Sequence, residues 1–161
     1  NTVSEDIAGV KAITLIDNRW SRPDIKTTQL LPNVLAKTEA NNKGAFEGIF
    51  IDSNGYVTEG TSSNIWIINY ENEIITRAID GQILSGITRK SIAQFAQLKN
   101  LIFKEKKFKK EDLYKSKEVF LTSASSFVTP IIEIDNKKIN DGQVGQMSVE
   151  LRKLYFKNFT D

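Results

Sequence analysis

The stretch VTEGTSSN, residues 57–64, shapes the expectations for both the fold and the chemistry of this chain. It begins within a predicted strand at residues 56–58. That strand is expected to pair with a strand at residues 46–51 through the turn Ser53-Asn54-Gly55, because Asn-Gly is the strongest short hairpin signal. A further strand is expected at residues 65–68. The stretch therefore places one carboxylate, Glu59, where a strand meets Gly60 and the small polar residues 61–64. Glu59 is either a turn residue that accepts backbone N–H bonds or a buried acceptor that faces a ligand cation.

Outward from this stretch, alternating strand and helix signals continue along the chain. Strands are expected at residues 12–17, 73–76, 101–108, 118–123, 128–134 and 138–139. Helices are expected at residues 30–41, 87–98, 111–115 and 147–159. The first helix gathers on one face Leu31, Val34, Leu35 and Thr38. The second is expected to direct inward Ile87, Ile92, Phe95 and Ala96. The pattern predicts an α+β fold, with a mixed sheet or open barrel flanked by helices, rather than a doubly wound parallel sheet.

The composition bounds the class of protein. A chain of 161 residues fits one domain, and 40% apolar residues are enough for a core. The 22 basic and 20 acidic residues give a net charge of +2, which does not argue for nucleic acid. The basic stretch at residues 104–110 is interpreted as a solvated strand end and turn. With no His and no Cys, the Ser–His and Cys–His arrangements and a Cys/His zinc site are excluded, and we expect no metal.

Location and completeness are less constrained by the sequence. No apolar run approaches the roughly 20 residues of a membrane span, so no membrane partner is expected. The absence of Cys suits a reducing compartment but also many exported bacterial proteins; a cytoplasmic location is the expectation. The chain begins at Asn1 and soon enters a predicted strand, which suggests the later part of a longer protein.

Three further features can carry chemistry. Lys26, in Asp24-Ile25-Lys26, is either a solvated charge or an amine made nucleophilic by desolvation. Gly86 begins a helix whose free N–H groups suit an anion such as phosphate, although a plain helix start is the alternative. The hydroxyl run TSASS at residues 122–126 either adds donors to that anion or ends a strand. An amine, a carboxylate and a helix N-terminus are together the protein groups that pyridoxal phosphate needs.

Five segments then carry a resemblance to a known family. RWSRPDIK (residues 19–26), LLPNVLAK (30–37) and GAFE (44–47) are similar to D-amino acid aminotransferases. VTEGTSSN and LSGITR (84–89) resemble signatures of the whole class of fold-type IV pyridoxal-phosphate enzymes, which also includes branched-chain aminotransferases and aminodeoxychorismate lyase. The resemblance implies that residues 1–161 form the larger, C-terminal cofactor-binding domain, an open barrel-like sheet flanked by helices, without the family's smaller N-terminal domain.

The resemblance also implies roles for particular residues. Lys26 would form the Schiff base with pyridoxal 5'-phosphate and later move a proton, and Glu59 would accept a hydrogen bond from the ring nitrogen. Leu84 would pack on one face of the ring, and Ile87 and Thr88 would bind the phosphate. Further contacts with the cofactor would come from Arg19, Ser63, Asn64, Gly86, Ser123 and Ser125. Where the family usually has a threonine hydroxyl for the phosphate, this chain has Ala124, so Ser123, Ser125 or a backbone N–H would replace it.

The implied activity is transamination of D-amino acids, of the D-alanine:2-oxoglutarate type, by a homodimer that takes amino acid and 2-oxo acid substrates. The open alternatives are a branched-chain L-amino acid aminotransferase, a 4-amino-4-deoxychorismate lyase, and a fragment that binds cofactor without turnover. The isolated chain is expected to be inactive, because in the family the groups that recognise the substrate carboxylate belong to the smaller domain.

Overall fold

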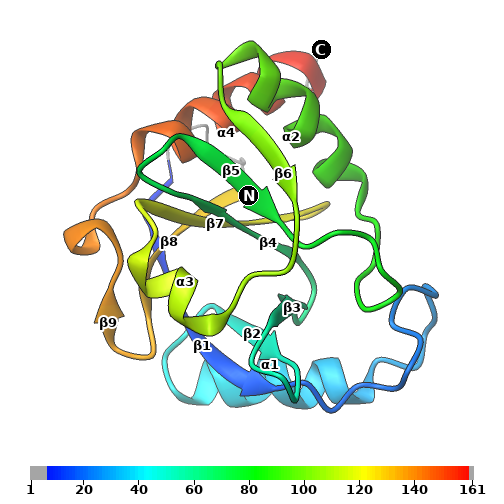
Figure 1. Ribbon diagram of the computed structural model, residues 1–161. Coiled ribbons are helices and arrows are strands. Elements are labelled where there is room, and N and C mark those ends of the chain that lie inside the picture. Colours follow the sequence, from blue (N-terminus) through cyan, green and yellow to red (C-terminus); the bar gives the residue numbers. More distant parts are fainter. Residues whose placement is uncertain (1–6, 160–161) are drawn as a thin grey trace.

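Nine strands in the computed structural model, which describes residues 7–159, join into one curled mixed sheet (Figure 1). The sheet order is β3-β2-β1-β8-β7-β4-β5-β6, and β9 pairs with β8. The strands are β1 (Val10–Ile16), β2 (Glu47–Ile51), β3 (Val57–Gly60), β4 (Asn64–Ile68), β5 (Glu73–Thr76), β6 (Ile102–Glu105), β7 (Glu118–Ser123), β8 (Phe127–Ile134) and β9 (Lys137–Lys138). The helices are α1 (Leu31–Asn42), α2 (Ile87–Leu98), α3 (Lys110–Lys115), α4 (Gln146–Phe159) and the short 3-10 helix η1 (Asn140–Gly142).

The strands of this sheet are connected by hairpins and by helical crossovers. The predicted hairpins are confirmed: β2 pairs antiparallel with β3, β4 with β5, and β8 with β9. The parallel pairs β1–β2 and β5–β6 are each connected through a helix, α1 and α2 respectively. Such crossovers are required because parallel strands cannot be joined by a tight turn. Strand β1 also pairs parallel with β8, and this pairing joins β3, β2 and β1 to the remaining strands of the sheet.

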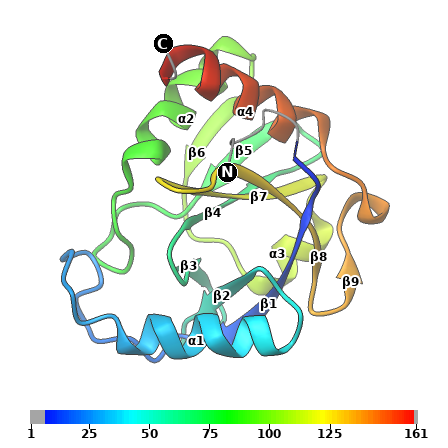
Figure 2. The same ribbon diagram turned by 180° about the vertical axis from the view of Figure 1, so that it is seen from behind.

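Both faces of the central strand β4 are buried, which explains its unbroken apolar sequence. Because side chains alternate along a strand, Ile65 and Ile67 enter the core inside the curl, together with Leu113 of α3. Trp66 and Ile68 lie on the opposite face in a second core that α2 and α4 cover (Figure 2). A strand that is covered on both sides can be apolar at every position.

Helix α2 has the predicted bounds and a largely predicted inner face. Ile92, Phe95 and Ala96 are buried, as expected. Ile87 is 74% exposed, so the expectation that it points inward is wrong. Ile87 is the first residue of the helix and lies before the part of α2 that packs on the sheet.

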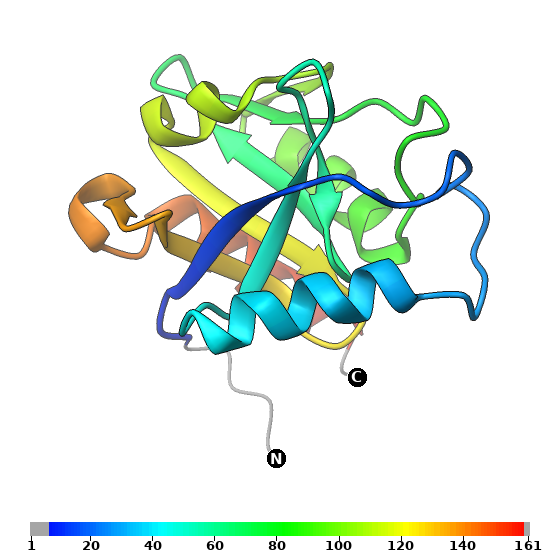
Figure 3. The ribbon, with the colours of Figure 1, turned by 90° about the horizontal axis from the view of Figure 1, so that it is seen from below.

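Helix α1 packs on β2 by small residues rather than by its large apolar ones. Ala36 and Ala40 are buried, whereas Leu31, Val34 and Leu35 are 67%, 57% and 59% exposed. Figure 3 shows α1 in front of β1 and β2. The predicted apolar face therefore points away from the sheet.

The ends of several strands meet on one side of the molecule. The connection after β1, residues 17–30, and the connection before α2, residues 77–86, lie side by side there (Figures 1 and 2), joined by a bond from Arg19 Nη2 to Gln82 O. No helix among residues 7–159 is long and apolar enough to cross a membrane.

Candidate active site

Glu59 lies on β3, an edge strand of the sheet. A second carboxylate, Glu47, fixes the turn that follows β3. Glu47 of β2 is buried and accepts bonds from Gly48 N at 2.9 Å, from Ser63 Oγ at 3.0 Å and from the Thr61 hydroxyl. Gly60 N donates to Ser63 O at 2.7 Å, and a Cβ at Gly60 would lie 2.1 Å from Ser63 Oγ, so a side chain there would displace that hydroxyl from Glu47. The structure thus places the side chain of Ser63 on Glu47 and not beside Glu59.

Glu59 itself is buried and has partners from three directions. Leu84 N donates to Glu59 Oε2 at 3.0 Å, and Asn64 Nδ2 lies 3.4 Å from the same oxygen. Arg19 Nη1 donates to Oε1. Burial raises the pKa of Glu59 to about 7, against the lowering effects of Arg19 and of the Leu84 N–H, while the nearby charge of Asp17 raises it further. Near neutral pH this carboxyl group is poised between its two forms.

Arg19 links Glu59 to Asp17 at the end of β1. Its Nε and Nη2 bond Asp17 Oδ1 and Oδ2 at 2.9 and 2.7 Å. Thr58 Oγ1 also donates to Asp17 Oδ2, at 2.7 Å. Bidentate charge-assisted bonds of this kind are strong and directional. They and the Thr58 hydroxyl hold the pKa of Asp17 below its usual range, although burial acts to raise it.

The start of α2 lies next to Glu59. Asn64 Nδ2 donates to Leu84 O at 2.9 Å, and a Cβ at Gly86 would lie 2.6 Å from Asn64 Oδ1. Gly86 is the N-cap of α2, and no side chain caps the helix there. The first N–H groups of α2 are thus open to an anion.

Hydroxyl groups extend this helix start towards the turn between β7 and β8. Thr88 Oγ1 donates to Ser123 O at 3.1 Å. The Ser123 hydroxyl lies 2.6 Å from that of Ser126 and 3.4 Å from that of Ser125. Three hydroxyls therefore cluster beside Ala124, where the resemblance leads one to expect a threonine.

These contacts connect most of the predicted site residues into one continuous polar site. It runs from Arg19 and Glu59 through Asn64, Leu84 and Gly86 to Thr88, Ser123 and Ser125. Ser63 stands outside it, and the exposed side chain of Ile87 can contribute only its backbone N–H. Lys26 lies exposed in the connection 17–30 and makes no hydrogen bond or ion pair within residues 7–159.

Sequence reasoning missed Asp17 and Thr58. Asp17 precedes Arg19 by two residues, but Arg22 and Asp24 have the same separation and pair with each other at the surface, at 2.8 Å. Spacing alone therefore could not single out Asp17. The only available signal was its position at the end of a predicted buried strand.

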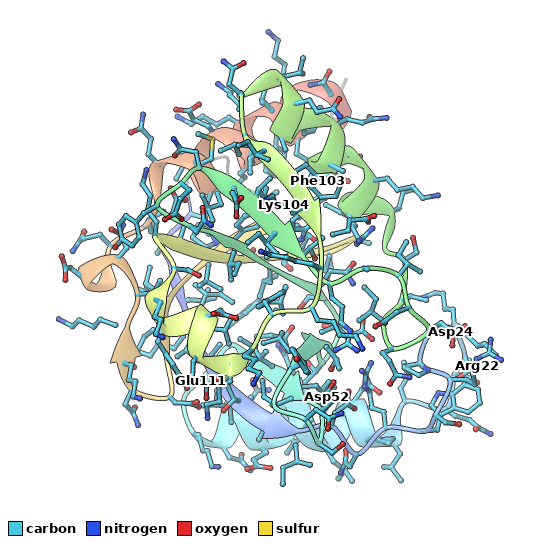
Figure 4. All side chains as sticks on the ribbon, viewed as in Figure 1. Arg22, Asp24, Asp52, Phe103, Lys104 and Glu111 are labelled. Atoms are coloured by element: carbon cyan, nitrogen blue, oxygen red, sulfur yellow. The ribbon has the colours of Figure 1, made fainter. Side chains whose placement is uncertain are left out.

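The basic stretch at residues 104–110 is largely engaged within the molecule. Lys104 pairs with Glu73, and Lys110 with Asp135 at 3.0 Å. Figure 4 shows Lys104 on β6, beside the β5 strand that carries its partner.

Comparison with known proteins assigns the chain to a family. Residues 4–134 match the model of the family described as Amino-transferase class IV. The chain belongs to the class IV aminotransferases. It is 42% identical over 140 residues to a D-alanine aminotransferase of Bacillus licheniformis, which covers 87% of this chain and 49% of that protein. It is 43% identical over 145 residues to a D-alanine aminotransferase of Staphylococcus epidermidis, which covers 90% and 51%.

Solved structures of class IV aminotransferases agree with the observed fold. The branched-chain amino acid aminotransferase of Escherichia coli is 26% identical, with a TM-score of 0.82 over 94% of this chain and 52% of that one. A branched-chain enzyme of T.th., complexed with N-(5'-phosphopyridoxyl)-L-glutamate, is 29% identical, with a TM-score of 0.84 over 92% and 52%. The predicted α+β fold and family are confirmed. The chain spans about half the length of the curated relatives that it matches.

Proposed function

We propose that this chain is the cofactor-binding domain of an aminotransferase that uses pyridoxal 5'-phosphate. One observation carries the proposal: a buried carboxylate, Glu59, is joined by a continuous set of contacts to an uncapped helix start at Gly86. The two ends match a ligand that has a ring nitrogen at one end and a phosphate at the other. The phosphopyridoxyl group in a solved relative supports this choice of ligand.

The residues of the chain would divide the work as follows. Glu59 would accept a hydrogen bond from the ring nitrogen, and Leu84 would lie against the ring. The N–H groups of Ile87 and Thr88 would bind the phosphate, assisted by the hydroxyls of Ser123 and Ser125. When bound, pyridoxal phosphate supplies an electron sink for the α-carbon of an amino acid. Lys26 would hold the cofactor covalently through its Nζ and afterwards carry a proton to and from that α-carbon.

Asn64 lies too close to Gly86 to leave room for a side chain there. A side chain at Gly86 would displace Asn64, which in turn holds Leu84 O and approaches Glu59. Asn64 therefore couples the ring end of the site to its phosphate end.

For the substrate, we favour D-amino acids, with D-alanine and 2-oxoglutarate as the pair to test. The support is the name shared by relatives that are 42% and 43% identical to this chain. A branched-chain L-amino acid aminotransferase is the second candidate, because structural neighbours with TM-scores of 0.82 and 0.84 carry that name. A 4-amino-4-deoxychorismate lyase and a cofactor-binding fragment without turnover remain as outcomes of the assay.

We also propose a homodimer. The side of α1 that carries Leu31, Val34 and Leu35 offers exposed apolar surface for association. Sedimentation of the chain before and after Val34→Ser and Leu35→Ser tests this idea. A monomer at all concentrations in the unaltered chain would contradict it.

The experiment for the cofactor traps the covalent link. The chain is incubated with pyridoxal phosphate, reduced with borohydride, digested, and the labelled peptide is mapped. We expect the label on Lys26, loss of label in Lys26→Arg, and full label in Lys90→Arg, which alters an exposed lysine of α2. If Lys26→Arg is still labelled, the cofactor is attached to another lysine and the assignment of Lys26 is wrong.

Turnover is tested separately, on this chain and on any longer form of the protein. We expect amino exchange between D-alanine and 2-oxoglutarate in a longer form and negligible exchange in the 161 residues alone. Misplacing a reacting group by about 1 Å can cost on the order of 10²-fold, and a site without the groups that in the family recognise the substrate carboxylate should lose more. Turnover of L-leucine but not of D-alanine would favour the branched-chain enzyme, and release of pyruvate from aminodeoxychorismate would favour the lyase.

A further inference from the structure

Two carboxylates share the single guanidinium of Arg19, and they share it unequally. Asp17 receives bonds from Nε and Nη2 and also from the backbone N–H of Arg19, at 3.2 Å. Glu59 receives a bond from Nη1 alone. The remaining bonds of Nη2 go to Gln82 O, at 3.2 Å, and to Thr58 Oγ1, at 3.3 Å.

The cluster formed by Asp17, Arg19 and Glu59 has one negative charge in excess when both acids are ionised. The three side chains are only 10%, 3% and 9% exposed, so solvent compensates little of this charge. The other groups facing Glu59 are Asn64 of β4 and the Leu84 N–H from the connection before α2, and neither titrates. A cationic ring nitrogen next to Glu59 would make the cluster neutral.

We propose that Asp17 is a positioning residue that acts through Arg19: by holding Arg19 with two guanidinium nitrogens, it prevents Arg19 from neutralising Glu59 and leaves that carboxylate's charge for a cationic ring. As far as the ligand is concerned, this inference rests on the proposed function. Its electrostatic part concerns only residues of this chain and can be tested without any ligand.

The geometry explains why the arrangement needs arginine. The planar fork of a guanidinium can bond one carboxylate along one edge and a second at its remaining nitrogen. An ammonium group carries its three donors on one nitrogen, so it lacks both the coplanar pair of donors and a separate nitrogen for the second carboxylate. Arg19 is also fixed from the side, because its guanidinium carbon lies 4.7 Å from the centre of the Phe50 ring. Without Asp17, the same guanidinium is free to pair fully with Glu59.

The chain contains a matched control for this arrangement. Arg22 bonds Asp24 through Nε and Nη2 at 2.9 and 2.8 Å, the same pattern that Arg19 makes with Asp17. Figure 4 shows Arg22 and Asp24 together at the outer end of their connection, away from the sheet. Asp24→Asn thus removes an equivalent pair that does not touch Glu59.

The first experiment follows the titration of Glu59 in the ligand-free chain by carbon-13 NMR, with the signal assigned by its loss in Glu59→Gln. We expect a midpoint near 7 in the unaltered chain. Asp17→Asn should lower the midpoint by about 1 pH unit or more, because an unshared cation favours the ionised carboxylate. Arg19→Lys should raise the midpoint, and Asp24→Asn should leave it unchanged.

The opposite signs separate positioning from structural damage. A general loosening of the site would admit water and move the midpoint in the same direction in Asp17→Asn and Arg19→Lys. Such a common direction, or no shift in Asp17→Asn, would overturn the proposal. Urea unfolding of each variant verifies that a folded chain is being titrated.

The second experiment measures binding of pyridoxal phosphate and of its carbocyclic analogue, in which carbon replaces the ring nitrogen. Asp17→Asn should weaken binding of pyridoxal phosphate by about 10-fold per unit of lowered midpoint, and it should spare the analogue. Equal losses for both ligands would overturn the role assigned to Asp17. If the unaltered chain binds neither ligand, the proposed function fails, while the titration still decides whether Asp17 controls Glu59.

Discussion

Replacing Glu59 by Gln should remove a pH-dependent cost to the stability of the ligand-free chain. The folded pKa of Glu59, about 7, lies above the ordinary value of 4.5 because the carboxyl group is buried. The folded state therefore holds the proton of Glu59 more tightly than the unfolded state does. Stability from this source is fully present below about pH 4.5, declines between about pH 4.5 and about pH 7, and is lost above that range.

The magnitude follows from the size of the pKa change. A rise from 4.5 to about 7 corresponds to about 3 kcal/mol, at about 1.4 kcal/mol per pKa unit. Gln cannot ionise, so the variant lacks the decline. The unfolding free energy of the unaltered chain minus that of Glu59→Gln should thus fall by about 3 kcal/mol between about pH 4 and about pH 8. Other titrating groups are common to both chains and largely cancel in this difference.

The assay is urea unfolding, followed by tryptophan fluorescence, at a series of pH values. Glu73→Gln provides a control of opposite sign, because Lys104 and Asn69 lower the pKa of Glu73. Its removal should lower stability at neutral pH and have no effect at low pH. A Glu59→Gln difference that is flat with pH, or that grows as pH rises, would refute the reasoning about the buried carboxylate.

The remaining predictions concern three other parts of the molecule. Glu118→Gln should lower the unfolding free energy by about 1.5–3 kcal/mol, since this carboxylate accepts bonds from Met147 N at 3.0 Å and Ser148 N at 2.8 Å at the start of α4. Urea unfolding measures the loss, and a value under about 0.5 kcal/mol, the lower limit for an uncharged hydrogen bond, would contradict the prediction. Thr88→Val should weaken pyridoxal phosphate binding by about 1–2 kcal/mol, because it removes the bond from the Thr88 hydroxyl to Ser123 O, at 3.1 Å, that ties the start of α2 to the β7–β8 turn. Gly86→Val should weaken binding by more, whereas Ile87→Ser, which changes an exposed side chain, should bind normally; titration calorimetry compares the three. Ala40→Leu should destabilise the chain by about 1–3 kcal/mol, because Ala40 is fully buried on the side of α1 that faces the sheet. Leu35→Ala should cost far less, and the reverse order in thermal unfolding would mean that α1 is turned the other way.

The hairpins of the fold could be predicted because their signals are local. Asn54-Gly55 marks the β2–β3 turn, and Asp135 and Asn136 take the left-handed conformation between β8 and β9 that suits such turns. The parallel pairing of β1 with both β2 and β8 could not be predicted, because nothing local to residues 10–16 specifies partners that lie far along the chain. Strand β6 is shorter than expected, ending at Glu105, although apolar Phe108 is still buried.

The candidate site was predictable where short motifs carry it and not where distant residues meet. Glu59, Gly86 and Thr88 lie in VTEGTSSN and LSGITR, and the structure places them along one set of contacts. The partner of Arg19 was not evident, because Asp17–Arg19 and Arg22–Asp24 are alike in spacing and differ only in burial. Burial depends on which strands enclose the pair, and that is a property of the whole fold.

Helix α1 shows why an apolar face read from sequence needs a structure to interpret it. Periodicity correctly placed Leu31, Val34 and Leu35 on one side of a helix, but it says nothing about what covers that side. The sheet instead receives Ala36 and Ala40, whose short side chains let α1 lie close to β2. A helix that is held close to a sheet by small residues must turn its large apolar side chains outward. The exposure of this side is therefore a consequence of how α1 packs on β2, and it gives the proposed association of two chains a defined surface to test.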